Sequence, residues 1–458
     1  MPATLIDEMT AALYEGILRR WYPLVLDRRC GGYYTNIRAD WSLPPEQEKM
    51  IVTQARHVWT ASHVARFTGE TETYIPVAMH GFTFLRDVMW DSRYGGFYQI
   101  RDRDGGPTDV RGWRDEKRAY GNAFAIYALA ALYGATGDAA VLGAARRAFE
   151  WVERHAHDPV HRGYFEFLTR EGEPFDRRSS YRTIASDASE LGYKDQNSSI
   201  HLLEAYTELY RLWPDPLVRE RLQELLTLIR DVMVDPRGYL RLFFEPDWTP
   251  VSFRDAPEEV RVPNEGLDHV SFGHDYETAF LMLEASDALG LENDTTTLRV
   301  ARRMLDHAIA WGWEMGVGGF FDAGYYFRGD EHCTITRHTK NWWAQAEALN
   351  ALLLFSRIYP RSPYLSYFLK QWEYVKRYIL DSEHGDWFEG GIDREPQFRS
   401  GPKSHIWKCT YHTTRALMNC IGHFRGAGAD EAGGGPSDIA EFAARWRLVA
   451  QRGALSPA

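Results

Sequence analysis

Segments with a helical spacing of apolar residues follow one another along almost the whole chain, and they fall into two kinds. Six have an apolar stripe and a charged face, which is typical of helices in a solvated outer layer. They are expected over 5–22, 73–89, 139–155, 216–233, 296–313 and 364–380. Six others, beginning near residues 54, 118, 197, 273, 341 and 405, include stretches such as 123–132 that are apolar on nearly every side. Helices of that kind belong in an interior layer.

A short glycine–aromatic signature follows each outer segment and recurs six times. The copies are Gly31-Gly32-Tyr33, Gly95-Gly96-Phe97, Arg162-Gly163-Tyr164, Arg237-Gly238-Tyr239, Gly318-Gly319-Phe320 and, least faithfully, Gly385-Asp386-Trp387. Their spacing of 64 to 81 residues accommodates two helices and their loops. Six outer and six inner helices in alternation predict an all-α fold, an (α/α)6 barrel over residues 1–426, with an open helical solenoid as the structural alternative. Residues 427–458 are expected to form a flexible joint and a C-terminal helix and tail.

Composition restricts the classes of function. The 458 residues, 44% of them hydrophobic, suffice for a large core. The formal net charge of -11 is spread without a basic run, so nucleic acid is not expected as a partner. No segment has the roughly 18 uninterrupted apolar residues of a membrane span, and the acidic, amphipathic N-terminus is unlike a signal peptide. Four cysteines without a CxxC pair favour a reducing compartment, so we expect a cytoplasmic protein. We also expect a monomer or a homodimer.

The inner helices all begin with unusually polar residues. These are Gln54, Arg56, Tyr120, Asn122, Asn197, His201, His274, Glu277, Asn341, Trp342, Trp343, Glu347, Trp407, Tyr411 and His412. If the inner helices are parallel, these side chains converge on one mouth of the barrel, where helix N-termini add partial positive charge and unpaired N–H donors. The sequence therefore predicts a concave site that favours a developing oxyanion. The insert at 255–269 is expected to form part of its wall.

Three of these residues are histidines at equivalent positions of different repeats, namely His201, His274 and His412. Because imidazole titrates near neutral pH, the group predicts proton transfer to and from a substrate. A single histidine could equally be a hydrogen-bonded core residue, but three at matched positions favour function. A zinc site is disfavoured because no HxH or HxxxH pair occurs among them and Arg56 would lie close by. We therefore expect neither a metal nor a cofactor.

Several polar and aromatic neighbours have two interpretations each. His274 and Glu277 share a helix face, so the carboxylate is expected to orient the imidazole or to form only a structural ion pair. Trp342 and Trp343 are adjacent and point in different directions, so at most one is expected to face a ligand squarely. Arg56 is expected to hold an anionic oxygen or to bridge helices. The glycine signatures lack the strand context of a nucleotide-binding loop.

Four motifs together resemble the N-acylglucosamine 2-epimerase superfamily, most closely its cellobiose 2-epimerase and mannose isomerase members. They are QNSSIHLLEAY at 196–206, SFGHDYETA at 271–279, NWWAQAEA at 341–348 and WKCTYH at 407–412. The resemblance spans nearly the whole barrel. It implies that an aldose opens its ring and loses its C2 proton to a histidine, which leaves an enediol or enediolate. Return of the proton to C2 gives the epimer, whereas its return to C1 gives the ketose.

The resemblance also assigns roles to residues. His274 and His412 would be the acid/base pair, with His201 as a third histidine near the reacting carbons. Arg56 would stabilise the oxyanion. Sugar binding and the orientation of these groups would fall to Tyr120, Asn197, Glu277, Trp342 or Trp343, Glu347 and Trp407. From their positions alone, at an inner-helix start and in the approach loop, Asn122 and Asp187 are further candidates for sugar binding. The implied partner is thus a small sugar.

The chain departs from disaccharide epimerases in the insert at 255–269, in the longer approach at 181–194 and at Cys409-Thr410, where a Gly-Pro often stands. Asp187, in that approach, could contact a second sugar ring or form a loop turn. The sugar and the product, epimer or ketose, therefore stay open here. Inverting glycoside hydrolases also use (α/α)6 barrels and need two carboxylates, for which Glu277 and Glu347 are the obvious pair. A non-catalytic carbohydrate-binding barrel would need only the aromatic platform.

Overall fold

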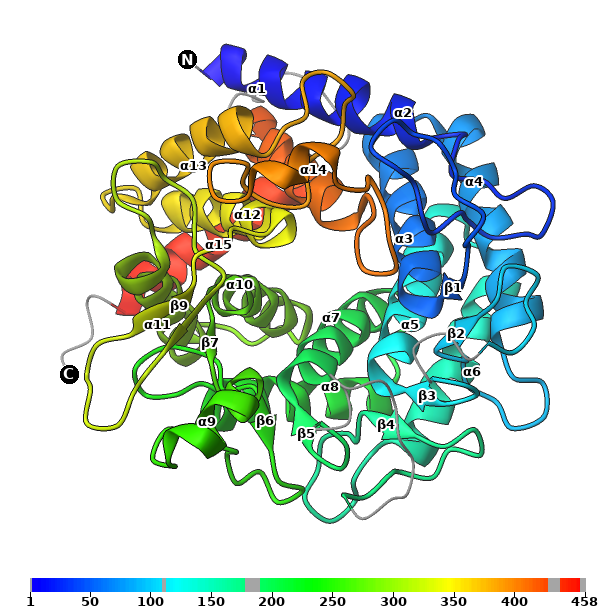
Figure 1. Cartoon of the computed structure of the whole chain (residues 1–458), viewed down its shortest axis with the longest axis horizontal. Helices are drawn as coiled ribbons and strands as arrows, with labels where there is room; N and C mark the ends of the chain where they lie inside the picture. Colours follow the sequence, from blue (N-terminus) through cyan, green and yellow to red (C-terminus); the bar gives the residue numbers. More distant parts are fainter. Residues whose placement is uncertain (1, 109–112, 178–189, 427–436, 454–458) are drawn as a thin grey trace.

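The computed structural model describes residues 2–108, 113–177, 190–426 and 437–453, and within them the helices form two concentric rings (Figure 1). The inner ring consists of α3 (Ile51–Thr68), α5 (Ala119–Thr136), α7 (Gln196–Leu212), α10 (Phe272–Ala288), α12 (Trp342–Ile358) and α14 (Tyr411–Gly426). The outer ring begins with α1 (Pro2–Ala11), which continues through a π-helical turn into α2 (Arg19–Trp21). It goes on with α4 (Thr71–Phe84), α6 (Ala139–His155), α8 (Pro216–Leu228), α11 (Thr295–Gly312) and α13 (Tyr364–Tyr378). The predicted (α/α)6 barrel is confirmed.

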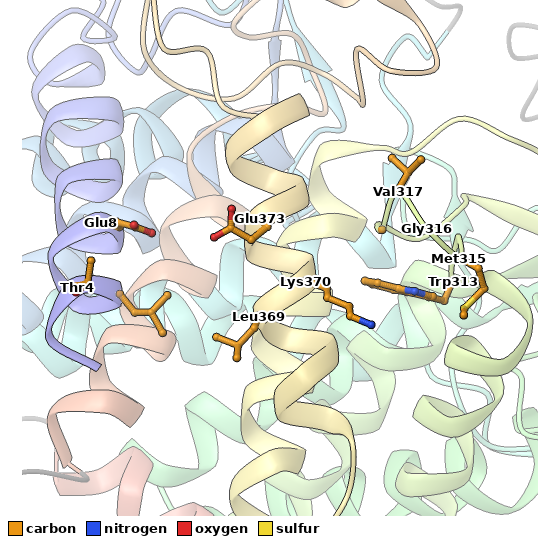
Figure 2. A pocket seen from close by; sticks show the side chains of 11 residues that line it. Thr4, Glu8, Trp313, Met315, Gly316, Val317, Leu369, Lys370 and Glu373 are labelled. Atoms are coloured by element: carbon orange, nitrogen blue, oxygen red, sulfur yellow. The ribbon is translucent and has the colours of Figure 1, made fainter. Parts of the chain in front are cut away.

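Both rings are closed. The last inner helix, α14, packs against α12 and also against α3, the first inner helix. In the outer ring, Trp372 Nε1 and Lys376 Nζ of α13 donate hydrogen bonds to Glu8 of α1, at 2.8 and 2.9 Å. A cavity of about 660 Å³ opens on the outer wall beside this junction, between α1, Leu369 of α13 and Trp313 (Figure 2). Closure excludes the open solenoid.

Short antiparallel strands precede the inner helices, a feature that the apolar patterns did not predict. β1 (Lys49–Met50) pairs with β2 (Ile100–Arg101), β3 (Lys117–Arg118) with β4 (Phe167–Leu168) and β5 (Lys194–Asp195) with β6 (Phe243–Phe244). β7 (Val270–Ser271), β8 (Ala323–Tyr325) and β9 (Thr334–Arg337) form a three-stranded sheet. Each pair joins the start of one inner helix to the loop after the next signature. The strands therefore tie consecutive repeats together at the end of the barrel where the inner helices begin.

The glycine of the signature is required by a close approach. In the first repeat Gly32 has a φ of 63°, and a Cβ there would lie 2.5 Å from Oε1 of Gln54. That oxygen accepts the backbone N–H of Tyr33 at 2.8 Å. Gln54, expected at the mouth, is instead a structural residue that fastens the signature turn to α3.

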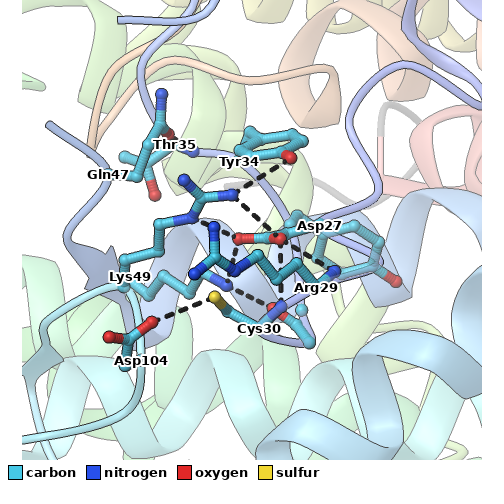
Figure 3. Close-up of polar contacts among 12 residues, drawn as sticks. Asp27, Arg29, Cys30, Tyr34, Thr35, Gln47, Lys49 and Asp104 are labelled. Carbon is cyan, nitrogen blue, oxygen red and sulfur yellow. Dashed lines mark hydrogen bonds and ion pairs between the residues drawn. The ribbon is translucent and has the colours of Figure 1, made fainter. Parts of the chain in front are cut away.

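At five of the six signature turns, a buried lysine binds both an acidic side chain and a backbone carbonyl of the turn. In the first, Lys49 Nζ donates to the Asp27 carboxylate at 3.1 Å and to the carbonyl of Gly31, and Arg103 Nε donates to Asp27 at 2.9 Å (Figure 3). The same arrangement recurs in Lys117–Asp91, Lys194–Asp158, Lys340–Glu314 and Lys403–Asp381. A buried charge is tolerated only when it is paired and hydrogen-bonded, so each lysine fixes a carboxylate and a turn carbonyl at once.

The fourth repeat lacks this lysine. Val270 stands at the corresponding place before α10, and Asp235 of the fourth signature pairs with Arg241 at 2.9 Å. The insert precedes this position and contains the short helix α9 (Glu258–Asn264). Its last residues, Asp268 and His269, lead directly into β7. The insert is thus joined to the start of the helix that carries His274.

Beyond the barrel, α15 (Ser437–Gly453) packs against α11, α12 and α14 with Ala443 and Trp446 buried. The expected joint at 427–436 lies outside the described residues. Among the helices described, none is long and apolar enough to cross a membrane.

Candidate active site

A cavity of about 380 Å³ lies at the N-terminal ends of the inner helices, and all six of those helices contribute to it. Its lining contains most of the predicted site residues, namely Arg56, Tyr120, Asn197, His201, His274, Glu277, Trp342, Trp343, Trp407 and His412. Asn341, Glu389 and His405 complete the lining. The parallel inner helices therefore converge on one mouth, as their polar first turns predicted.

The indole of Trp343 contacts two histidines. Its ring centroid is 4.8 Å from that of His274 and 5.7 Å from that of His412. The indole comes so close to α10 that a Cβ on Gly273 would lie 2.5 Å from its ring. The absence of a side chain at Gly273 therefore lets Trp343 pack against α10, where it contacts both imidazoles.

His274 is a neutral imidazole at physiological pH. Its Nδ1 lies 2.8 Å from the Ser271 hydroxyl, one turn earlier on the same segment. Burial, reinforced by the neighbouring His201 and His269, lowers the pKa of His274 to about 3. When Nδ1–H donates to Ser271, Nε2 carries the lone pair that a general base needs.

His412 is hydrogen-bonded to a carboxyl group with an unusual protonation state. Its Nδ1 lies 2.6 Å from Oε1 of Glu347 on the neighbouring helix α12. Burial raises the pKa of the Glu347 carboxyl well above its usual range, against the opposing charge of Arg415. Burial and the charges of Arg56 and Arg415 lower the pKa of His412. The pair therefore favours a proton on Glu347 and a neutral imidazole on His412.

Arg415 is the central residue beneath the cavity, and the sequence reasoning missed it. Its guanidinium donates to Glu277 at 2.6 Å and to Glu347 at 2.7 Å, and it also contacts Glu204. It lies three residues after His412, on the same face of an inner helix. The available signal was an arginine one helical turn after His412, on the same face of α14.

His201 belongs to the same network. Its Nδ1 lies 2.9 Å from Oε2 of Glu204, and the Tyr411 hydroxyl donates to Oε1 of that carboxylate at 2.6 Å. Burial opposes ionisation, but Arg415 and the hydrogen bond from His201 lower the pKa of Glu204 to about 2. Glu204 is thus an anion that orients His201 from below, in the way predicted for Glu277 and His274.

Arg56 is buried in the wall of the cavity. Its Nη1 donates to the carbonyl of Trp407 at 2.9 Å and its Nη2 to the Tyr120 hydroxyl at 3.0 Å. The guanidinium lies over the ring of Phe124, with 4.4 Å between Cζ and the centroid. Its Nε is buried and has no hydrogen-bond partner among the residues that the structure describes. Arg56 both bridges helices and brings a positive charge to the cavity lining.

Two site expectations need correction. Asn122 is fully buried and does not line the cavity. Its Oδ1 accepts the backbone N–H of Phe97 at 2.9 Å, so in the second repeat it fastens the signature turn as Gln54 does in the first. Glu277 lines the cavity but its carboxylate pairs with Arg415, whereas Ser271 is the partner of His274. In both cases the side chain binds a partner from another repeat, Phe97 or Arg415, instead of the group that the sequence suggested.

The remaining expectations concern position. α14 begins at Tyr411 rather than near residue 405, so Trp407 lies in the preceding loop and still reaches the cavity. Trp342 is buried and its ring meets His405 edge-on at 5.9 Å, while Trp343 faces the histidines, as expected for adjacent residues. Asp187 lies outside the described residues.

Glu277, Glu347 and His412 offer possible metal-ligand atoms within 4.8 Å of one another. The guanidinium of Arg415 donates to both of these carboxylates. An arginine therefore already balances the charge of this group, which makes it a poor cation site.

Comparison with known proteins agrees with this geometry. The family profile described as N-acylglucosamine 2-epimerase matches residues 32–416. The chain is 30% identical over 431 residues to the cellobiose 2-epimerase of Bacteroides fragilis, covering 92% of this chain and 100% of that protein. It is 25% identical over 348 residues to a D-mannose isomerase of Thermobifida fusca, covering 75% and 77%. The structure of cellobiose 2-epimerase from Bacillus thermoamylovorans superposes with a TM-score of 0.78, at 25% identity, over 92% of this chain and 99% of that one.

A closed (α/α)6 barrel with a polar mouth, together with these relatives, defines an isomerase-class enzyme that acts on carbohydrates, a sugar epimerase or isomerase. The chain belongs to the N-acylglucosamine 2-epimerase family.

Proposed function

We propose that the protein is a 2-epimerase for free reducing sugars in which His274 and His412 move the C2 proton. The observation that carries the proposal is that both imidazoles line one cavity and flank the same indole, Trp343. A cellobiose-type disaccharide is the favoured substrate, because the Bacteroides fragilis relative that aligns over 92% of this chain is a cellobiose 2-epimerase.

The first step is proton abstraction from the open-chain aldose. Nε2 of neutral His274 takes the C2 proton, and the C2–H electron pair forms a C1=C2 double bond as charge moves to O1. The low pKa of His274 keeps its base form available across the neutral range. Arg56, with a buried positive charge beside the cavity, stabilises the resulting enediolate.

The second step returns a proton to the other face of C2. Nε2–H of His412 donates to the carbon while Nδ1 receives the proton of Glu347, so the imidazole never becomes an anion. The 2.6 Å hydrogen bond and the raised pKa of Glu347 support this coupled transfer. Loss of the proton on His274 to solvent and uptake of a solvent proton by Glu347 reset the enzyme, so the proton that reaches C2 comes from water. Side chains of the chain itself donate and accept the proton at the carbon.

The other lining residues bind and orient the sugar. Trp343 and Trp407 offer aromatic faces to the sugar ring. Tyr120 and Asn197 offer hydroxyl and amide groups to sugar hydroxyls, and His201, held by Glu204, lies ready to contact the reacting carbons.

Aldose–ketose isomerisation is the second candidate, because the same enediolate gives a ketose when the proton returns to C1. The relative named as a D-mannose isomerase supports isomerisation as the second candidate reaction. Hydrolysis is less well supported, since Glu277 and Glu347 are both bound to Arg415 instead of facing each other across a space for water.

The test is incubation of the purified protein with cellobiose, mannobiose, glucose and mannose in D₂O with a chelator, followed by NMR. Deuterium at C2 together with the 2-epimer supports the proposal. Deuterium at C1 with a ketose would support the isomerase. Release of monosaccharides from a disaccharide, or no exchange with any of the four sugars, would overturn the proposal.

A further inference from the structure

An open cavity of about 1060 Å³ lies at the end of the barrel away from the candidate active site. Its wall is made by the first residues of α11, by residues 358–362 where α12 ends and by the second half of α15. The candidate active site is lined by Trp342 and Trp343, at the other end of α12. The two cavities are therefore separated by the length of that helix.

Positive charge gathers in this second cavity, which we call the arginine cavity. Its arginines come from three separate segments and are Arg299 and Arg302 of α11, Arg361 of the turn after α12 and Arg447 of α15. Among the described residues of the lining there is no aspartate or glutamate. In a chain whose formal net charge is -11, such a wall is a local exception that attracts anions.

Three of these side chains have no hydrogen bond or ion pair within the described parts of the chain, namely those of Arg299, Arg361 and Arg447. Arg302 does have a partner, since its Nε lies 3.4 Å from the carboxylate of Asp306. Asp294, which precedes α11, already caps that helix with its side chain. Three guanidinium groups are thus left to bind an anion from outside the chain.

The remaining lining residues narrow the kind of anion. Guanidinium groups bind phosphoryl oxygens through paired, parallel hydrogen bonds, and several of them around one cavity fit more than one phosphoryl group. Thr295, Ser362 and Gln451 offer hydrogen bonds to hydroxyls. Tyr359 has the one aromatic ring of the described lining, and that ring already contacts the guanidinium of Arg302, with 4.5 Å between Cζ and the centroid. The lining therefore favours a hydroxyl-bearing phosphate over one with a flat aromatic base.

We propose that the arginine cavity is a second ligand site, which binds a small sugar-like phosphate with two phosphoryl groups. Guanidinium groups from α11, from the turn after α12 and from α15 bind the phosphoryl oxygens, while the threonine, serine and glutamine side chains bind hydroxyls. No step of the proposed sugar reaction uses this cavity, so the inference goes beyond the proposed function and is tested separately from it.

The test is calorimetric titration of the full chain with fructose 1,6-bisphosphate at low ionic strength. We expect one site per chain with a Kd below about 1 mM. Arg361→Ala and Arg447→Ala each raise the Kd at least about tenfold, because each removes charge-assisted hydrogen bonds to the phosphate. Arg361→Lys, which keeps the charge but loses the paired geometry, has a smaller effect. Arg147→Ala, which removes an exposed arginine of α6, is the matched control with an unchanged Kd.

The triple variant Arg299→Ala, Arg361→Ala, Arg447→Ala is expected to lose binding while it keeps its melting temperature and its rate of sugar exchange. A parent protein that does not bind the bisphosphate, or an unchanged Kd in the folded triple variant, would overturn the inference. Equally tight binding of inorganic sulfate would overturn it too, since unspecific charge attraction would then suffice, and so would tighter binding of adenosine triphosphate. Because the titration needs no turnover, its result does not depend on whether the protein exchanges any sugar.

Discussion

His412 and Glu347, on neighbouring inner helices, are joined by a hydrogen bond of 2.6 Å although their positions are 65 residues apart in the chain. Burial raises the pKa of Glu347 and lowers that of His412, so the pair holds one proton that the proposed mechanism delivers to C2.

This relationship predicts an unusual pH profile. Since the pKa of His274 is about 3, its base form persists through mildly acidic pH, and kcat/KM shows no decline near pH 6.5. Activity falls on the alkaline side as the Glu347–His412 pair loses its proton. Glu347→Gln, which cannot titrate, lowers the rate and removes the alkaline decline. A decline centred near pH 6.5 would contradict the assignment.

Each proposed proton-transfer residue should be essential for exchange. His274→Ala and His412→Ala lower kcat for C2 exchange at least about 10²-fold, the usual contribution of a positioned acid or base. His332→Ala, on the exposed turn between β8 and β9, serves as the control and keeps its rate. Near-normal turnover in either active-site variant would reject that residue's role.

Gly273 permits the close approach of Trp343, so Gly273→Ala displaces the indole from its contacts with the two histidines. We expect a loss of kcat/KM of at least about tenfold, since misplacement of a positioning group is costly. Gly266→Ala is the matched control, because a Cβ there meets none of the described residues within 4 Å. Tryptophan fluorescence and a crystal structure of the variant would report the displacement, and an unmoved indole with full activity would refute the prediction.

The buried lysines predict a stability effect far from the cavity. Lys194→Met leaves Asp158 without its 2.7 Å partner, and the expected loss is about 3–5 kcal/mol of unfolding free energy. Lys370→Met, on the exposed face of α13, changes it by less than about 0.5 kcal/mol. Denaturant unfolding measures both, and equal midpoints for the two variants would contradict the prediction.

The same pair has a defined pH dependence. Burial alone would raise the pKa of Asp158, but the hydrogen bond from Lys194 outweighs burial and lowers that pKa in the folded protein. The stabilisation is therefore complete above the unfolded pKa of about 3.9 and is lost as the pH falls through the lower folded value. The stability difference between parent and Lys194→Met accordingly shrinks in acid.

Much of the fold followed from local pattern. A segment such as α6, apolar on one side only, has to lie in an outer layer, and one such as α5, apolar all round, has to be covered on every side. The alternation of the two kinds, with a signature turn between them, determined the double ring. It also placed His201, His274 and His412 at helix starts that face one mouth.

What only the tertiary structure decided is which group each polar side chain binds. Asn122 and Tyr120 are two residues apart on one helix, yet one fastens a turn and the other lines the cavity. Arg415 draws in carboxylates from three other helices, and the proton state of Glu347 depends on their combined charge. Buried hydrogen bonds and pKa values depend on neighbours brought together by packing, and the linear spacing of residues carries no record of those neighbours.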